Sequence, residues 1–70
     1  MTNAEIRTEL TQGASATYNT WNARTCEANS RPATVLAAVK AFDTGGRSEV
    51  KNAVITVSDP RGWYSVARAA

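Results

Sequence analysis

The chain has 70 residues, with eight basic and six acidic side chains, no histidine and a single cysteine. Its length corresponds to one domain, which we expect to span residues 1–70, and a lone cysteine excludes an internal disulfide framework. Without histidine the chain lacks the commonest general base and metal ligand, so we predict that it is not an enzyme and binds no metal or cofactor. The net charge of +2 comes from basic residues scattered singly, unlike a polybasic arm.

A domain of this size builds a small core. It buries only about 60% of the surface that its unfolded chain exposes. We therefore expect a larger protein as partner, or self-association as a homodimer. The most apolar stretch, residues 33–41, is much shorter than the roughly 20 residues of a membrane span, and no signal-peptide pattern is found. The sequence predicts a cytoplasmic protein with no membrane partner.

The amino-terminal segment, residues 1–13, begins with the spacing of a capping box, with Thr2 as cap and Glu5 three residues later. Ile6 and Leu10 would share one face of a short helix. The alternative is a strand, because apolar and polar side chains also alternate here. Helix is the favoured interpretation. Because two turns are marginal without packing, a mobile segment is the other expectation.

Residues 16–28 are rich in threonine and aromatic side chains and predict a strand. The alternation fails near Asn22, where a bulge would bring Trp21 and Cys26 to the core side. A turn at the same point would instead divide the segment into a hairpin. We expect Cys26 to be a small buried hydrophobic residue.

The central segment, Ser30 to Gly46, has the pattern of one helix, about residues 31–43. Ser30 would cap its amino end, Pro32 would lie in its first turn, and Gly45 would be the left-handed residue after its last turn. Apolar residues at helical spacing predict the face that packs on a sheet. These residues are Val35, Leu36, Val39 and Phe42.

The carboxyl-terminal segment has the clearest strand pattern, a hairpin of about residues 49–57 and 63–68 around a turn that ends at Gly62. A three-residue turn with Gly62 in the left-handed region predicts a register that places Trp63 on the side of the helix. The sequence thus predicts an α+β domain, with one main helix on an antiparallel sheet of three or four strands.

The far side of this hairpin is the predicted partner-binding surface. In that register it carries four side chains, with Arg61 beside them in the turn: Tyr64, Val66, Val54 and Arg68. Aromatic residues and arginine are typical of interface centres. The alternative is that the amino-terminal segment covers this face and makes it a second core. Binding of single-stranded nucleic acid by arginine-flanked aromatic residues is a further alternative, against which the weak net charge counts.

Three features together resemble a known class of proteins. A strand ending in Thr25-Cys26-Glu27-Ala28, an alanine-rich helix capped by Ser30 and a hairpin ending in Gly62-Trp63-Tyr64 resemble small phage-encoded inhibitors, anti-CRISPR proteins among them. The resemblance is one of element order and size, and it assigns no residue roles. It implies a stoichiometric inhibitor that occludes a bacterial defence complex, in a bacterial or phage-infected cell. The basic net charge departs from the acidic, DNA-mimicking members.

Overall fold

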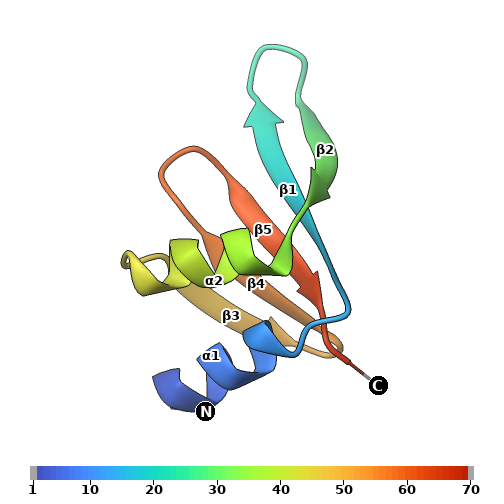
Figure 1. Cartoon of the computed structure of the whole chain (residues 1–70). Helices are drawn as coiled ribbons and strands as arrows, with labels where there is room; N and C mark the ends of the chain where they lie inside the picture. The colour runs from blue at the N-terminus through green and yellow to red at the C-terminus, as the bar shows by residue number, and fades with distance from the viewer. Residues whose placement is uncertain (1, 70) are drawn as a thin grey trace.

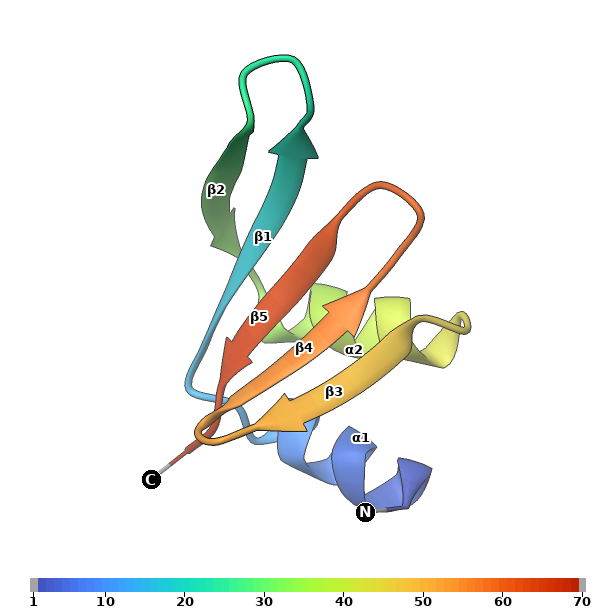
Figure 2. The same cartoon turned by 180° about the vertical axis from the view of Figure 1, so that it is seen from behind.

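Two helices cover one face of a five-stranded antiparallel sheet in the computed structural model, which describes residues 2–69 (Figures 1 and 2). The strand order is β2-β1-β5-β4-β3. The fold is therefore α+β as predicted. Besides the main helix it contains the amino-terminal helix α1, and its five strands exceed the three or four expected. The elements are α1 Asn3–Thr11, β1 Ser15–Asn22, β2 Glu27–Ala33, α2 Val35–Asp43, β3 Arg47–Lys51, β4 Val54–Ser58 and β5 Trp63–Ala67.

Helix α1 confirms the capping box and the helical interpretation of the amino-terminal segment. The Thr2 hydroxyl accepts a hydrogen bond from the Glu5 amide at 3.2 Å, and the Glu5 carboxylate accepts one from the Thr2 amide at 3.4 Å. Ile6 and Leu10 are both buried in the core. Their packing supplies the stabilisation that two isolated turns lack.

The break near Asn22 proves to be a turn, so β1 and β2 form a hairpin. The Asn22 side-chain oxygen accepts hydrogen bonds from the amides of Arg24 and Thr25, and Cys26 has a left-handed φ of 55°. Cys26 is exposed, so the expectation of a buried cysteine is wrong. The outer half of this hairpin extends beyond the helices in both views (Figures 1 and 2).

Helix α2 begins later than the sequence pattern suggests. Its cap is Thr34, whose hydroxyl accepts from the Ala37 amide at 3.1 Å, and Ser30 and Pro32 lie in β2. Strand β2 is at the edge of the sheet, where proline's missing donor is tolerated. The helix ends as predicted, with Gly45 in the left-handed region at φ 99°. The prediction of the helix start is therefore wrong by one turn, and that of its end is confirmed.

The region expected to be one strand over about 49–57 is two strands, β3 and β4, joined by a tight turn. Asn52 takes a left-handed φ of 56° there, a conformation that asparagine tolerates better than most residues. The core lies between the sheet and the helices, and one layer of small and aliphatic side chains forms it: Ile6, Leu10, Ala16, Ala38, Val39, Ile55, Val57 and Val66. Neither helix among the described residues has the length and apolar character to cross a membrane.

Candidate binding surfaces

The connection between β4 and β5 has four residues, 59–62, and not the three that the turn pattern suggests. Asp59 closes it, because one carboxylate oxygen accepts from the amides of Arg61 at 2.9 Å and Gly62 at 2.7 Å. Gly62 is not left-handed, and a Cβ there would overlap the carbonyl oxygen of Asn19. Ser58 pairs with Trp63 as a result, which shifts the register by one residue and turns every β5 side chain to the other face.

The predicted partner surface is therefore not one face of the sheet. Val66 is fully buried in the core, and Tyr64 packs partly buried against it on the side of the helices. Val54 lies on the opposite face and is 39% exposed. The alternative of a second core on the far face is also wrong, because Val66 joins Ile6 and Leu10 in the one core beneath the helices. The shared placement of these residues was a wrong prediction, and its cause is the loop length.

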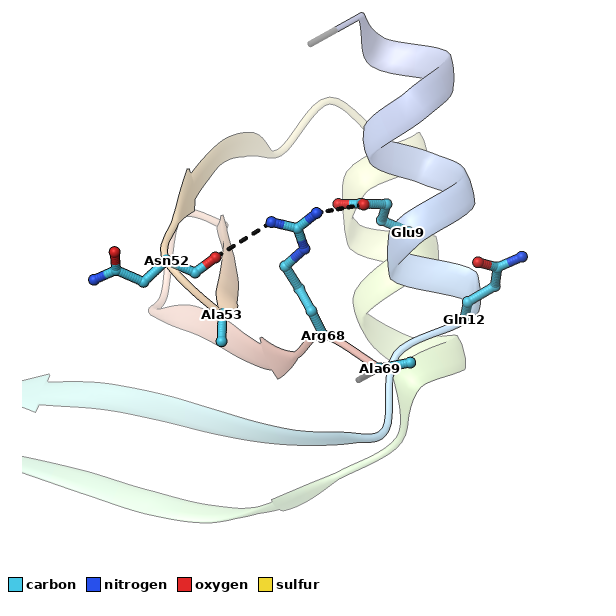
Figure 3. Close-up of a pocket in the computed structure, with 6 residues that line it drawn as sticks. All are labelled: Glu9, Gln12, Asn52, Ala53, Arg68 and Ala69. Carbon is cyan, nitrogen blue, oxygen red and sulfur yellow. Dashed lines mark hydrogen bonds and ion pairs between the residues drawn. The ribbon is translucent and has the colours of Figure 1, made fainter.

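Arg68 lies on the side of the helices and joins distant parts of the chain (Figure 3). One guanidinium nitrogen pairs with the Glu9 carboxylate of α1, and another donates to the Asn52 carbonyl at 3.2 Å. Its own amide donates to the Ala53 carbonyl at 2.8 Å. Although the depression around it measures about 410 Å³, the Arg68 guanidinium is engaged within the fold. Arg68 thus ties α1 to the β3–β4 turn.

Arg61 and Tyr64 line the same groove on the side of the helices, which we call the tyrosine groove. Tyr18 and Tyr64 pair across β1 and β5 with ring centroids 4.6 Å apart. The Arg31 guanidinium lies 5.7 Å from the centroid of the Tyr18 ring. The groove has a volume of about 460 Å³, and these residues line it: Tyr18, Thr20, Arg31, Pro32, Ala33, Thr34, Ala37, Asp59, Arg61 and Tyr64.

The Tyr18 hydroxyl is held in place by another residue of this groove. It donates to the Asp59 carboxylate at 3.2 Å. Partial burial, followed by this hydrogen bond, raises the pKa of Tyr18 above its ordinary value. Tyr18 is therefore a neutral donor at physiological pH, and the Asp59 carboxylate is occupied by this hydroxyl and by two backbone amides.

The second candidate surface is the face of the sheet that the helices leave uncovered, which we call the tryptophan face. The register brings Trp63 opposite Asn19 and Ser58 on this face, not on the helix side as the sequence suggests. Trp21, two residues beyond Asn19, points the same way and is 58% exposed. The two tryptophans are thus diagonal neighbours on adjacent strands, within reach of one another's side chains.

A buried amide supports the tryptophans. Asn19 is only 7% exposed although it lies on the uncovered face. Its amide nitrogen donates to the Ser65 hydroxyl at 3.2 Å and to the Trp63 carbonyl at 3.4 Å, while its oxygen accepts from the Ser30 hydroxyl at 2.5 Å. These bonds link β1, β2 and β5 next to Trp63 and hold this part of the face in one arrangement.

Comparison with protein families, curated proteins and solved structures gives no match for this chain. Two of the three features behind the resemblance to phage inhibitors also differ in the structure, because residues 25–28 form a turn and the start of β2, and Ser30 caps no helix. Among residues 2–69 there is no group of three or more His, Cys, Asp or Glu that could hold a metal ion. The surfaces themselves therefore carry the functional argument.

Proposed function

We propose that the protein is a small non-catalytic protein-binding module that docks on a larger protein through the tryptophan face. One observation carries the proposal: the helices cover one side of the sheet only, and Trp21 is 58% exposed on the other side, diagonal to Trp63. Antiparallel sheets with one solvated face normally present polar side chains there. Two tryptophans on such a face are the exception that a partner would explain.

The chemistry of the face suits a protein partner. Tryptophan is among the residues most enriched in the energetic centres of interfaces, where polar residues at the rim exclude water. Around the pair lie short hydroxyl side chains on neighbouring strands, including Ser58, Thr56 and Thr17. Because these side chains are short, a partner surface can approach the backbone of the sheet closely. A face lined by short side chains suits the surface of another protein better than a small molecule, which binds in a deep pocket.

The narrower form of the proposal is a phage-type inhibitor that occludes a bacterial CRISPR-type defence complex. The resemblance of size and element order to phage inhibitors supports this narrower proposal. CRISPR-type complexes are therefore the first class of partner to test. Binding of single-stranded nucleic acid to the tryptophan pair is the alternative function. In proteins that bind single-stranded nucleic acid, bases stack on aromatic side chains and basic residues line the path of the phosphate backbone. Here they are scattered, and the net charge is +2.

The test compares two exposed apolar side chains. Trp21→Ala removes the exposed tryptophan of the tryptophan face, and Leu36→Ala removes a side chain that is 77% exposed on α2. Each variant and the wild-type chain are immobilised and offered a bacterial lysate and, separately, a purified CRISPR-type effector complex. We expect the wild type and Leu36→Ala to retain the same partner and Trp21→Ala to lose it, since truncating an anchor residue costs about 2 kcal/mol or more.

Three controls make the outcome decisive. Thermal melts of both variants should stay close to the wild type, because both side chains are exposed. Titration with labelled oligonucleotides at low and high salt separates nucleic-acid binding, which weakens steeply as salt rises. Sedimentation of the chain alone tests the expected homodimer. Equal capture by all three proteins, or capture by none, contradicts the proposal.

A further inference from the structure

The tyrosine groove holds two arginines without acidic partners. Arg31 approaches the Tyr18 ring from β2, and Arg61 lines the same groove from the β4–β5 connection. In the part of the chain that the structure describes, the ion pairs belong to Arg7 with Asp43 and to Arg68 with Glu9, and to neither of these two arginines. Two arginines therefore line one groove without an ion-pair partner among the described residues, and their hydrogen-bond donors are available to a ligand.

Asp59 is the acidic residue that lines the groove, and it forms no ion pair with either arginine. Its carboxylate instead accepts the Tyr18 hydroxyl and two amides of its own turn. The cation of Arg61 acts on Tyr18 as well, because it counteracts part of the rise in that residue's pKa. The first turn of α2, from Thr34 to Ala37, forms a further wall. A helix amino terminus carries partial positive charge and adds to the attraction of an anion.

We propose that the tyrosine groove binds a carboxylate side chain of an acidic polypeptide segment, held between Arg31 and Arg61 above the tyrosine pair. Planar guanidinium groups match carboxylates with two parallel hydrogen bonds each. The tyrosine rings supply an apolar floor for the aliphatic stem of a glutamate. This contact lies on the other face of the sheet from the tryptophan face and goes beyond the proposed function, since it can exist whether or not that face docks a partner.

A polypeptide carboxylate suits the groove better than the backbone of a nucleic acid. Nucleic-acid affinity comes from many phosphates neutralised along a track of cations. Two cations line the groove, and Arg7 and Arg68 do not extend them into a track because both are engaged in ion pairs. Asp59 lines the groove as well, and its charge repels a dianionic phosphate more than a singly charged carboxylate.

The test uses a short oligoglutamate peptide as probe and the matching oligoglutamine peptide as its neutral control. Titrations of the full chain are followed by two-dimensional amide NMR, which also reports whether each variant is folded. We expect the oligoglutamate to shift the amides of Tyr18, Tyr64 and Gly62, with weaker binding as salt rises. Arg31→Gln and Arg61→Gln should each weaken binding by about tenfold or more, as loss of a charge-assisted hydrogen bond does.

Arg24→Gln is the matched control, because Arg24 is exposed in the β1–β2 turn and carries the same charge. It should bind the peptide like the wild type, and so should Trp21→Ala, which separates this site from the tryptophan face. The proposal is overturned if the oligoglutamine binds equally well, if Arg24→Gln weakens binding as much as Arg31→Gln, or if no groove amide shifts. Tighter binding of a labelled single-stranded oligonucleotide to the same amides would overturn the choice of a polypeptide.

Discussion

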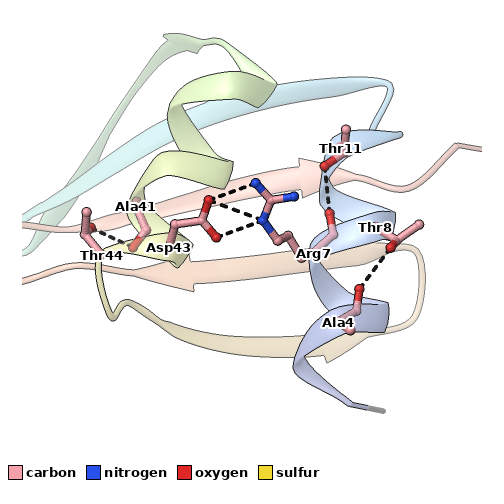
Figure 4. A network of polar contacts seen from close by, with 7 residues as sticks. All are labelled: Ala4, Arg7, Thr8, Thr11, Ala41, Asp43 and Thr44. Carbon is pink, nitrogen blue, oxygen red and sulfur yellow. Dashed lines mark hydrogen bonds and ion pairs between the residues drawn. The ribbon is translucent and has the colours of Figure 1, made fainter.

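Arg7 of α1 and Asp43 at the end of α2 form a two-pronged ion pair, with Arg7 Nε 2.9 Å from Asp43 Oδ1 and Nη2 3.0 Å from Oδ2 (Figure 4). The pair joins the two helices where they lie side by side on the sheet. Asp43 stands at a helix carboxyl terminus, where the helix dipole disfavours a negative charge. Arg7 compensates this charge and orients α1 at the same time.

This ion pair predicts a loss of stability in acid. The hydrogen bond from Arg7 lowers the pKa of the Asp43 carboxyl. A carboxyl whose pKa is lower in the folded state stabilises that state above its ordinary pKa, and the contribution disappears as the pH falls through the lowered value. Arg7→Gln should therefore be less stable than the wild type at neutral pH and converge with it in acid.

Urea unfolding midpoints measured from neutral to acidic pH test this prediction. The control is Asp43→Asn, in whose background Arg7→Gln should have little further effect. Because both side chains are about half exposed, we expect the difference to be smaller than that of any core truncation. If the unfolding midpoints of wild type and Arg7→Gln differ by the same amount at every pH, the ion pair with Asp43 is not the cause of the difference.

The register of the last hairpin predicts opposite outcomes for two valines. Val66→Ala should destabilise the domain by about 2 kcal/mol, because it removes two buried methyl groups and leaves a cavity. Val54→Ala should change stability by no more than about 0.5 kcal/mol, as for other surface substitutions. Chemical denaturation of the two variants measures both. Similar losses for both valines would mean that the strands pair in the register expected from the sequence.

Local sequence patterns predict where a helix starts or ends when a single capping residue determines that position. The Thr2 and Glu5 spacing gives the start of α1, and the left-handed Gly45 gives the end of α2. The start of α2 is different, because Ser30 and Thr34 are both good caps and Pro32 suits a helix start or an edge strand. The pairing of Ser30 with Asn19 decides in favour of the strand. That pairing is a long-range contact, which local patterns do not contain.

The candidate surfaces depend on the same kind of information. The turn pattern of Asp59 to Gly62 is compatible with connections of three or four residues, and a difference of one residue reverses both faces of β5. Arg61 and Tyr64 are the predicted site residues that the structure brings together. Tyr18 and Arg31 join them only because β1 pairs with β5 and β2, so the sequence alone does not reveal the groove.

The cap of α2 offers a direct test of where this helix starts. Thr34→Ala should cost about 0.5–2 kcal/mol and fray the first turn of α2, because the Ala37 amide loses its side-chain acceptor. Thr34→Asp should restore the cap. Ser30→Ala should leave the helix unchanged and instead disturb Asn19, which loses a hydrogen bond. Backbone chemical shifts of residues 30–38 distinguish these outcomes, and fraying caused by Ser30→Ala but not by Thr34→Ala would favour the earlier start.

The anchored Tyr18 hydroxyl predicts a loss of stability in alkali. Partial burial and the bond to Asp59 raise the pKa of Tyr18 in the folded state. A group with a raised folded pKa stabilises the fold fully below its unfolded pKa, about 10 for tyrosine, and this contribution is lost as the pH rises through the raised value. The ionised phenolate would also face the Asp59 carboxylate across a hydrogen-bond distance.

Tyr18→Phe removes this ionisation and keeps the ring that Tyr64 and Arg31 contact. We expect the variant to lose less stability than the wild type between neutral and strongly alkaline pH, as measured by denaturant unfolding midpoints. Asp59→Asn should give an intermediate result, because the amide oxygen can still accept the turn amides while the negative charge is gone. Absorbance titration of the phenolates in the folded chain gives the pKa directly. Parallel stability curves for wild type and Tyr18→Phe would show that the hydroxyl titrates as freely in the folded chain as in the unfolded one.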